Sequence, residues 1–168
     1  SRASFKLLEL NEKFKFLQKN TNLLDLGSCP GGWSQVASKI IIKGKILSID
    51  IKYMEPIKKV VFLKSNILKK STKDKIKSFF HDGLDVIISD MAANTTGNKS
   101  LDSIRTNQLC ADVLTLSSKI LKPKGVFVSK LFMGDDFIEV KNLAKSIFKD
   151  VNFFKPKSSR NESKETYL

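Results

Sequence analysis

Three charged side chains and one glycine-rich turn stand at the ends of apolar runs in the sequence, and these residue types can do chemistry. The turn is Gly27-Ser28-Cys29-Pro30-Gly31-Gly32, and the charged residues are Asp50, Asp90 and Lys130. Each apolar run has the length and composition of a buried strand. Ligands of open α/β sheets bind at the edge where the carboxyl ends of parallel strands meet. We therefore expect the four features to form one site.

The glycine-rich turn and Asp50 together indicate a nucleoside-containing cofactor. The turn is not the G-x-G-x-x-G pattern that binds a pyrophosphate, because its third residue is Cys29, and the G-K-[ST] of a P-loop is absent. Glycines let a ligand approach the backbone, and the next helix offers unpaired N–H groups. Asp50, 23 positions after Gly27, can accept hydrogen bonds from both hydroxyls of a ribose. S-adenosyl-L-methionine, whose product is S-adenosyl-L-homocysteine, suits this layout; the alternative is that Asp50 only caps a turn.

Apolar periodicity predicts the alternating strands and helices that place these residues. Strands are expected at residues 23–27, 46–50, 60–63, 84–88, 125–132, 151–154 and 164–168. Helices are expected at residues 1–18, 33–41, 67–80, 100–121 and 135–149. This alternation predicts an α/β fold in one domain, residues 1–168, with a mostly parallel seven-stranded sheet covered on both faces. No helix separates the last two strands, so they are expected to pair antiparallel.

Composition narrows the class of protein. Thirty Lys and Arg against 17 Asp and Glu give a net charge of +13, which indicates either a nucleic-acid partner or solubility alone. The sequence has only two cysteines, Cys29 and Cys110, and one histidine, His81, which predict neither a disulfide framework nor a metal site. A catalytic role for Cys29 as a nucleophile is not favoured, because its motif contains no histidine that could act as a base. No apolar stretch is long enough to cross a bilayer. The chain begins at Ser1 without Met and ends within an expected strand, so both natural termini are expected to lie beyond it.

Four motifs of the sequence occur together in an order typical of one family. They are residues 25–35 (DLGSCPGGWSQ), Ser89-Asp90-Met91-Ala92, Ser158-Ser159-Arg160 with residues 163–167 (SKETY), and the opening Ser1-Arg2-Ala3 with Phe5-Lys6-Leu7. In this order they resemble the FtsJ/RrmJ family of ribose 2′-O-methyltransferases, and the resemblance runs from Ser1 to Leu168. It implies a Rossmann-like methyltransferase fold that uses S-adenosyl-L-methionine and no metal.

The resemblance also assigns roles to individual residues. It implies a catalytic tetrad of Lys6, Asp90, Lys130 and Glu165. It implies cofactor contacts from Gly27, Ser28, Pro30, Gly31, Gly32, Trp33, Asp50, Ile51, Asn66 and Asp90. Relatives commonly carry Asp where this chain has Asn66, which still offers an acceptor to an adenine edge, and Ala where it has Cys29. Without the resemblance, Lys6 would be one of many exposed lysines and Glu165 a solubilising residue at a strand edge.

These residue types suit methyl transfer to a ribose 2′-hydroxyl, which is a weak acid and a poor nucleophile. The enzyme must align oxygen, methyl and sulfur and help the proton leave. Lys130 is expected to contact the 2′-oxygen, as a base if neutral or as an electrostatic stabiliser if charged, while the other three tetrad residues orient it. Methylation of base amino groups would show an Asp/Asn-Pro-Pro-aromatic motif at residues 89–92, and cytosine C5 methylation would need a cysteine after the fourth or fifth strand. The sequence has neither.

Basic residues near both ends of the sequence are the expected RNA contacts. They are Arg2, Lys6 and Lys13 of residues 1–20, and Lys155, Lys157, Arg160 and Lys164 near the C-terminus. Within the family, the shortest members act on a uridine of large-subunit (23S-type) ribosomal RNA, which implies a role in ribosome biogenesis. Related members methylate the tRNA anticodon loop, and more distant ones mRNA caps; a non-catalytic RNA-binding or assembly factor is a further alternative. The expected protein is a cytoplasmic monomer without membrane contact, or a mitochondrial one if a presequence has been removed.

Overall fold

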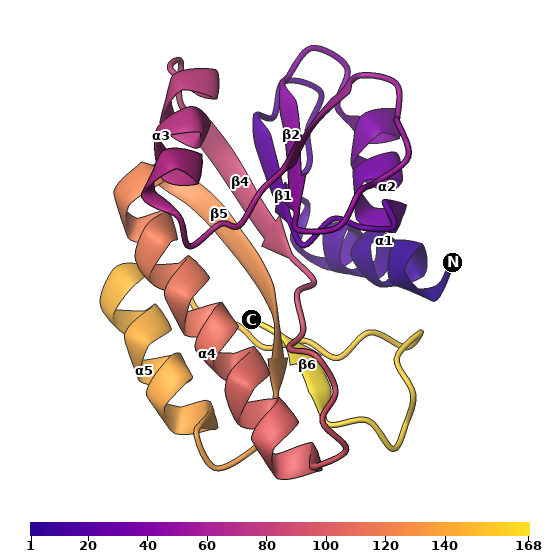
Figure 1. Ribbon diagram of the computed structural model, residues 1–168, viewed down its shortest axis with the longest axis vertical. Coiled ribbons are helices and arrows are strands. Elements are labelled where there is room, and N and C mark those ends of the chain that lie inside the picture. Colours follow the sequence, from indigo (N-terminus) through magenta and orange to yellow (C-terminus); the bar gives the residue numbers. More distant parts are fainter.

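The computed structural model describes all residues from Ser1 to Leu168, arranged as an α/β domain around a central sheet (Figure 1). In chain order the elements are α1 (Arg2–Phe14), β1 (Leu23–Leu26), α2 (Gly32–Ile40), β2 (Ile46–Asp50), β3 (Val60–Lys64), α3 (Lys70–Phe79), β4 (Leu84–Ser89), α4 (Lys99–Ile120), β5 (Leu121–Phe132), α5 (Phe137–Ile147) and β6 (Glu165–Tyr167). The sheet has six strands in the order β3-β2-β1-β4-β5-β6. Strands β1 to β5 are parallel and β6 is antiparallel to β5. The predicted α/β class and mostly parallel sheet are confirmed.

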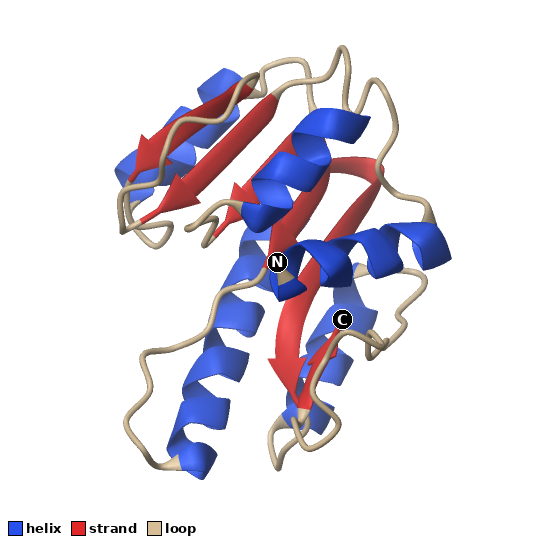
Figure 2. Cartoon of the chain, turned by 90° about the vertical axis from the view of Figure 1, so that its right-hand side faces the viewer, coloured by secondary structure: helices blue, strands red, loops and turns tan.

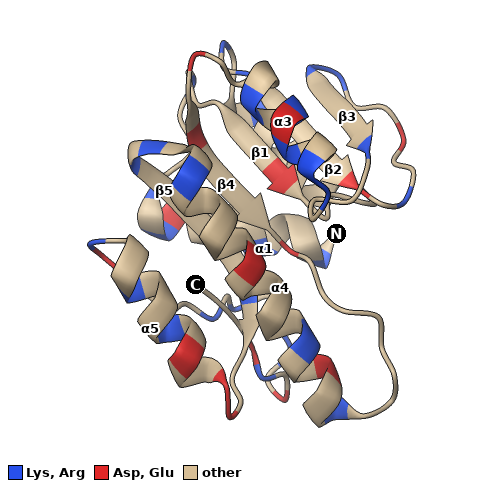
Figure 3. Ribbon diagram, turned by 60° about the vertical axis from the view of Figure 1, so that its left-hand side comes forward, with Lys and Arg blue, Asp and Glu red and all other residues tan.

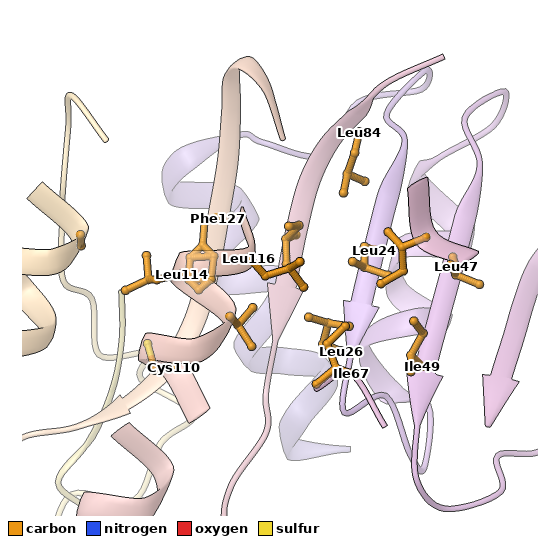
Figure 4. Close-up of a cluster of buried hydrophobic side chains, with 14 of the residues drawn as sticks. Leu24, Leu26, Leu47, Ile49, Ile67, Leu84, Cys110, Leu114, Leu116 and Phe127 are labelled. Carbon is orange, nitrogen blue, oxygen red and sulfur yellow. The ribbon is translucent and has the colours of Figure 1, made fainter. Parts of the chain in front are cut away.

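Helices cover both faces of the sheet because successive strand residues point to opposite sides (Figure 2). Leu24, Leu26 and other residues of one face pack against α3, α4 and α5 (Figure 4). Leu23, Ile46 and Val86 belong to the other apolar cluster, which includes residues of α1 and α2. Burial on both faces explains why the central strands are continuous apolar runs in the sequence.

The strand order creates a switch point between β1 and β4. From β1 the chain proceeds outward to β2 and β3, and it then returns through α3 to β4, which pairs with the other side of β1. The glycine-rich turn, Asp50 and Asp90 lie at the carboxyl ends of β1, β2 and β4. The topology therefore brings them to the same edge of the sheet, as the sequence predicts.

The first helix is shorter than the predicted residues 1–18. It ends at Phe14 because Lys15 adopts a left-handed conformation with φ of 51°, and the N–H of Lys15 donates to the carbonyl of Asn11. The side chain of Asn11 then accepts a hydrogen bond from the backbone N–H of Leu17. Leu17 follows this turn and is also buried. Its burial explains why apolar residues continue at helical spacing in the sequence after the helix has ended. No helix of the structure has the length and hydrophobicity that crossing a lipid bilayer requires.

Residues 151–154 do not form the expected seventh strand. Phe154 makes one antiparallel bridge to Tyr167, and the three-residue β6 offers no partner to residues 151–153. A groove of about 1130 Å³ lies beside them, between β5, α1 and the end of α5, and no predicted site residue lines it. Among the other boundaries, the largest differences are at β5, which already begins at Leu121, and at α3, which begins only at Lys70.

Asn107 of α4 fixes the end of β5, two residues beyond Lys130. Its side-chain amide donates to the carbonyl of Phe132 at 2.9 Å and to Asp136 Oδ1 at 2.8 Å. Its Oδ1 accepts the backbone N–H of Phe132 at 2.8 Å. Asn107 is fully buried, so a helix replaces a neighbouring strand as the hydrogen-bond partner at this point of β5.

Replacing Asn107 with Ala should lower the free energy of unfolding by about 2–4 kcal/mol, because polar groups of Phe132 and Asp136 lose their partner. Urea unfolding followed by far-UV circular dichroism measures the change. Gln108→Ala is the matched control, since Gln108 is exposed and its amide reaches only Asp112. Equal stability of the two variants would show that the Asn107 contacts do not hold β5.

Candidate active site

The four residues of the predicted tetrad meet in one cluster of alternating charge. Lys6 Nζ lies 2.6 Å from Glu165 Oε1. Lys130 Nζ lies 3.6 Å from Glu165 Oε2 and 3.3 Å from Asp90 Oδ1. The side chains are 12–20% exposed, so they are largely shielded from water yet reachable from one side. Two ammonium groups and two carboxylates balance one another in formal charge.

Strand register explains why these side chains converge. Ser89 of β4 pairs with Ser129 of β5, so Asp90 and Lys130 are the next residues along neighbouring parallel strands. In the antiparallel pair, Lys130 is opposite Tyr167 and Phe132 is opposite Glu165. Side chains two apart on a strand share a face, so Lys130 and Glu165 project to the same side of the sheet. That side faces α1, which supplies Lys6.

Glu165 is the carboxylate that both lysines share. Burial alone would raise its pKa, but the neighbouring charges of Lys130 and Lys6 and the hydroxyl of Tyr167 outweigh burial and hold the pKa below its usual range. Glu165 is therefore ionised at neutral pH. It joins α1 to β5 through charge-assisted contacts.

Tyr167 is a member of the cluster that the sequence reasoning missed. Its hydroxyl lies 2.6 Å from Asp90 Oδ1 and 3.1 Å from Glu165 Oε1, and donates to these carboxylates. The side chain is 1% exposed. Burial and the two carboxylates raise the pKa of Tyr167, so the phenol stays protonated and remains a donor. The available signal was its position two residues after Glu165, which places both on one face of the strand.

The glycine-rich turn requires glycine at two positions. Gly27 has φ of 68° and Gly31 has φ of 119°, both in the left-handed region that favours glycine. A Cβ on Gly27 would also lie 2.2 Å from Cγ of Met91, the residue after Asp90. The turn is thus packed against the start of the loop that carries Asp90. Gly32 begins α2 directly behind it.

Asp50 binds the turn and the end of β2 together. Its Oδ2 accepts from the backbone N–H of Cys29 at 2.8 Å, and its Oδ1 accepts from Lys52 N at 2.9 Å. Asp50 therefore does cap a turn, which was the alternative that the sequence left open for it. Each carboxylate oxygen has a further lone pair, so the same group can also accept hydrogen bonds from a ligand.

The other predicted cofactor contacts differ in accessibility. Ile51 is 62% exposed, and Pro30 and Asn66 are also exposed. The Oδ1 of Asn66 already accepts one hydrogen bond from Leu68 N at 2.9 Å. Trp33 is buried, and its ring N–H donates to the carbonyl of Ala3 at 2.7 Å. The structure therefore gives the Trp33 side chain a packing role between α2 and α1.

The residues around the turn fit a nucleoside cofactor. The Oγ of Ser28 is one of three buried side-chain polar atoms without a hydrogen-bond partner, so the turn has unused capacity for a polar ligand. Glycine backbone and an acceptor carboxylate, Asp50, stand beside it. No group of three or more His, Cys, Asp or Glu side chains is arranged to hold a metal ion.

Most of the predicted RNA contacts lie on the surface, where Lys and Arg occur along much of the chain (Figure 3). Exposed members are Arg2, Lys13, Lys157, Arg160 and Lys164. Lys155 is also exposed, but its ammonium donates to the backbone carbonyls of Ser163 and Asn161. Lys155 therefore closes its own loop, and its charge, like that of Lys6, which pairs with Glu165, is already engaged.

A buried polar chain supports β1 beneath the turn. Ser34 Oγ donates to Asp25 Oδ2 at 2.6 Å and lies 2.6 Å from Ser48 Oγ. Asp25 is 1% exposed. Burial raises its pKa to about 7; the hydrogen bond from Ser34 opposes this shift, and the charges of Asp90 and Asp50 add to it. A buried carboxyl thus titrates near neutral pH directly below the candidate cofactor site.

A parallel sheet with this strand order, a glycine-rich turn after β1 and an acid after β2 define the Rossmann-like class of methyltransferases. The profile of FtsJ-like methyltransferases matches residues 1–168, and the chain belongs to that family. The family resemblance drawn from the four motifs is confirmed, and the protein is a methyltransferase.

Relatives are similar over the whole chain. The ribosomal RNA large subunit methyltransferase E of Pelagibacter ubique is 43% identical over 168 residues, which are 100% of this chain and 83% of the relative. The protein of the same name from Rickettsia akari is 47% identical over 174 residues, covering 100% of this chain and 77% of the relative. A crystal structure of a ribosomal RNA methyltransferase from Plasmodium falciparum superposes with a TM-score of 0.86 at 33% identity, covering 99% of this chain and 94% of that one.

Asp25 should make stability fall as pH rises from about 4 to about 7. The unfolded chain releases the Asp25 proton near its ordinary pKa of 3.8, whereas the folded protein keeps it until about 7. Within this window, each rise in pH therefore shifts the folding equilibrium toward the unfolded state. Asp25→Asn removes the titration and keeps an acceptor for Ser34. Across the window, urea unfolding should show the wild type losing on the order of 3–4 kcal/mol relative to the variant. Parallel pH profiles would contradict the raised pKa.

Proposed function

We propose that the protein transfers the methyl group of S-adenosyl-L-methionine to a ribose 2′-hydroxyl in RNA, with large-subunit ribosomal RNA as the substrate. The observation that carries this proposal is the cluster of Lys6, Glu165, Lys130 and Asp90 beside the glycine-rich turn. The relatives are named as ribosomal RNA large subunit methyltransferases, which supports ribosomal RNA over transfer RNA. An intact tetrad favours an enzyme over a non-catalytic RNA-binding factor.

The cofactor would lie along the carboxyl ends of β1, β2 and β4. Gly27, Ser28 and Gly31 would line it through the turn, Asp50 would accept from its ribose hydroxyls, and Asn66 would face its base. When bound, this group supplies a methyl that its sulfonium charge has already activated. The packing of Met91 on Gly27 would keep the glycine-rich turn at a fixed position relative to Asp90.

Lys130 would act on the 2′-oxygen. Its ammonium is held between Asp90 and Glu165, so it is oriented before RNA binds and can stabilise negative charge that develops on the 2′-oxygen while the hydroxyl proton passes to solvent water. Lys6 would fix the second carboxylate oxygen of Glu165, and the Tyr167 hydroxyl would keep Asp90 and Glu165 apart at a constant distance. The four tetrad residues are placed by different elements, namely α1, the end of β4, β5 and β6, which makes the geometry rigid.

The net charge of +13 supports a polyanionic substrate. Cationic side chains gain affinity for RNA by releasing the counterions that surround its phosphates. The FtsJ-like methyltransferase fold extends over all of residues 1–168. Exposed basic residues beside the site would therefore hold the RNA backbone, while the pocket positions one ribose.

Replacing Lys130 with Met should reduce the rate of methyl transfer by at least about 100-fold and leave the Kd for the cofactor within about threefold, because the lost charge acts on the 2′-oxygen and not on the cofactor. Single-turnover transfer and isothermal titration calorimetry measure the two quantities. Lys75→Met, at an exposed position of α3, is the matched control and should be unchanged. Wild-type rates in Lys130→Met would remove Lys130 from the reaction.

The reaction itself is tested with cofactor labelled in its methyl group. Large ribosomal subunits, free ribosomal RNA and transfer RNA are offered separately, and the labelled RNA is hydrolysed with alkali. A 2′-O-methyl group blocks cleavage at its own phosphodiester, so the label should appear in an alkali-resistant dinucleotide from ribosomal RNA. Label in single nucleotides would mean base methylation, and label in transfer RNA alone would refute the substrate.

A further inference from the structure

Residues 155–164 form a basic loop that is attached to the rest of the protein in an unusual way. The loop carries Lys155, Lys157, Arg160 and Lys164. Its internal hydrogen bonds include Ser159 N to Pro156 O and Ser163 N to Arg160 O. The only hydrogen bonds that join residues 156–162 to another element are two bonds to Glu9 of α1.

Glu9 binds the loop with both carboxylate oxygens. Oε2 accepts the backbone N–H of Lys157 at 2.6 Å, and Oε1 accepts the backbone N–H of Ser158 at 3.1 Å. Two consecutive amides directed at one anion form a concave site that suits a carboxylate, and charge-assisted bonds of this kind are stronger than neutral ones. One side chain therefore fixes the middle of the loop.

The same helix holds both parts of this C-terminal segment. Lys6 and Glu9 lie three residues apart, on neighbouring turns of α1. Lys6 binds Glu165 of the tetrad, while Glu9 binds the loop that precedes it. Figure 2 shows the C-terminal segment lying close to α1. The position of the loop is thus linked to the position of a tetrad residue.

Apart from the two bonds to Glu9, residues 156–162 make no hydrogen bond that would keep the loop against α1. The hydroxyl oxygens of Ser158 and Ser159 are buried without a hydrogen-bond partner, so they favour no particular position through polar contacts. Four of its residues are basic and repel one another. Glu9 therefore supplies the polar contacts that hold the middle of the loop against α1.

We propose that Glu9 is a positioning residue for RNA binding, which locks the basic loop against α1 so that both form one surface for RNA phosphates. The surface comprises Lys157, Arg160 and Lys164 of the loop with Arg2 and Lys13 of the helix. This inference rests on the proposed function, because it assumes an RNA substrate. It predicts that Glu9, although acidic, increases the affinity of this basic surface for RNA.

The sign of the effect separates this role from simple electrostatics. A carboxylate near a polyanion repels it, so removal of an acidic side chain without a structural contact should strengthen RNA binding. Glu12 provides that case, since it is exposed on the same helix. Removal of Glu9 should weaken binding even though it makes the protein more positive, because the loop cations lose their fixed position.

The experiment compares Glu9→Ala with Glu12→Ala by fluorescence anisotropy of a labelled single-stranded RNA oligonucleotide over a series of salt concentrations. Glu9→Ala should bind about tenfold more weakly, and loss of two phosphate contacts should make the slope of log K against log salt shallower by about 1.4. Glu12→Ala should bind as tightly as the wild type or more tightly. The Kd for S-adenosyl-L-methionine, measured by calorimetry, should stay within about twofold in both variants.

A second variant keeps the test independent of folding. Glu9→Gln removes the charge but retains one acceptor oxygen, so it should lie between the wild type and Glu9→Ala in RNA affinity, with an unchanged circular dichroism spectrum. RNA binding by Glu9→Ala and Glu9→Gln equal to or tighter than the wild type would overturn the role of Glu9. Failure of the wild type itself to bind RNA would instead refute the proposed function.

Discussion

One ion pair joins the two ends of the chain and closes the site. Lys6 and Glu165 are separated by 159 positions in sequence and by 2.6 Å in space. Burial of a single charge would be costly, so each group depends on the other, and Glu165 also depends on Lys130. This ion pair holds the first helix at the carboxyl edge of the sheet. There Lys6 adds the fourth charged group to the three that the strands supply.

The charged residues of the site are arranged so that each buried charge has an opposite charge or a hydrogen-bond donor beside it. Asp90 and Lys130 reach the cluster through strand register, and the neutral hydroxyl of Tyr167 fills the space between the carboxylates. Behind the cluster, Met91 packs on Gly27, so the position of the glycine-rich turn and that of Asp90 are not independent. A change at one element is therefore felt at the others, and a rigid arrangement of this kind is what in-line transfer to a poor nucleophile requires.

Local patterns in the sequence were sufficient for the sheet and for the residues at its edge. Central strands such as β1 are buried on both faces and mostly apolar, and Asp50 and Asp90 stand where such runs stop. Contacts between distant segments were not predictable, because no local pattern reports them: Tyr167 and Glu9 owe their partners to tertiary packing. The same reason accounts for the errors at residues 15–18, where buried apolar residues belong to a turn, and at residues 151–154, where partly buried ones precede and form an isolated bridge.

A double-mutant cycle between Lys6 and Glu165 tests the closing ion pair most directly. Single-turnover methyl transfer to RNA is measured for the wild type, Lys6→Met, Glu165→Gln and the double variant. If the two groups act as one unit, the double variant should be about as slow as the slower single variant, so the losses are far from additive in free energy. Losses that multiply fully in rate would mean that Lys6 and Glu165 act independently, and the account of a site closed by their contact would be wrong.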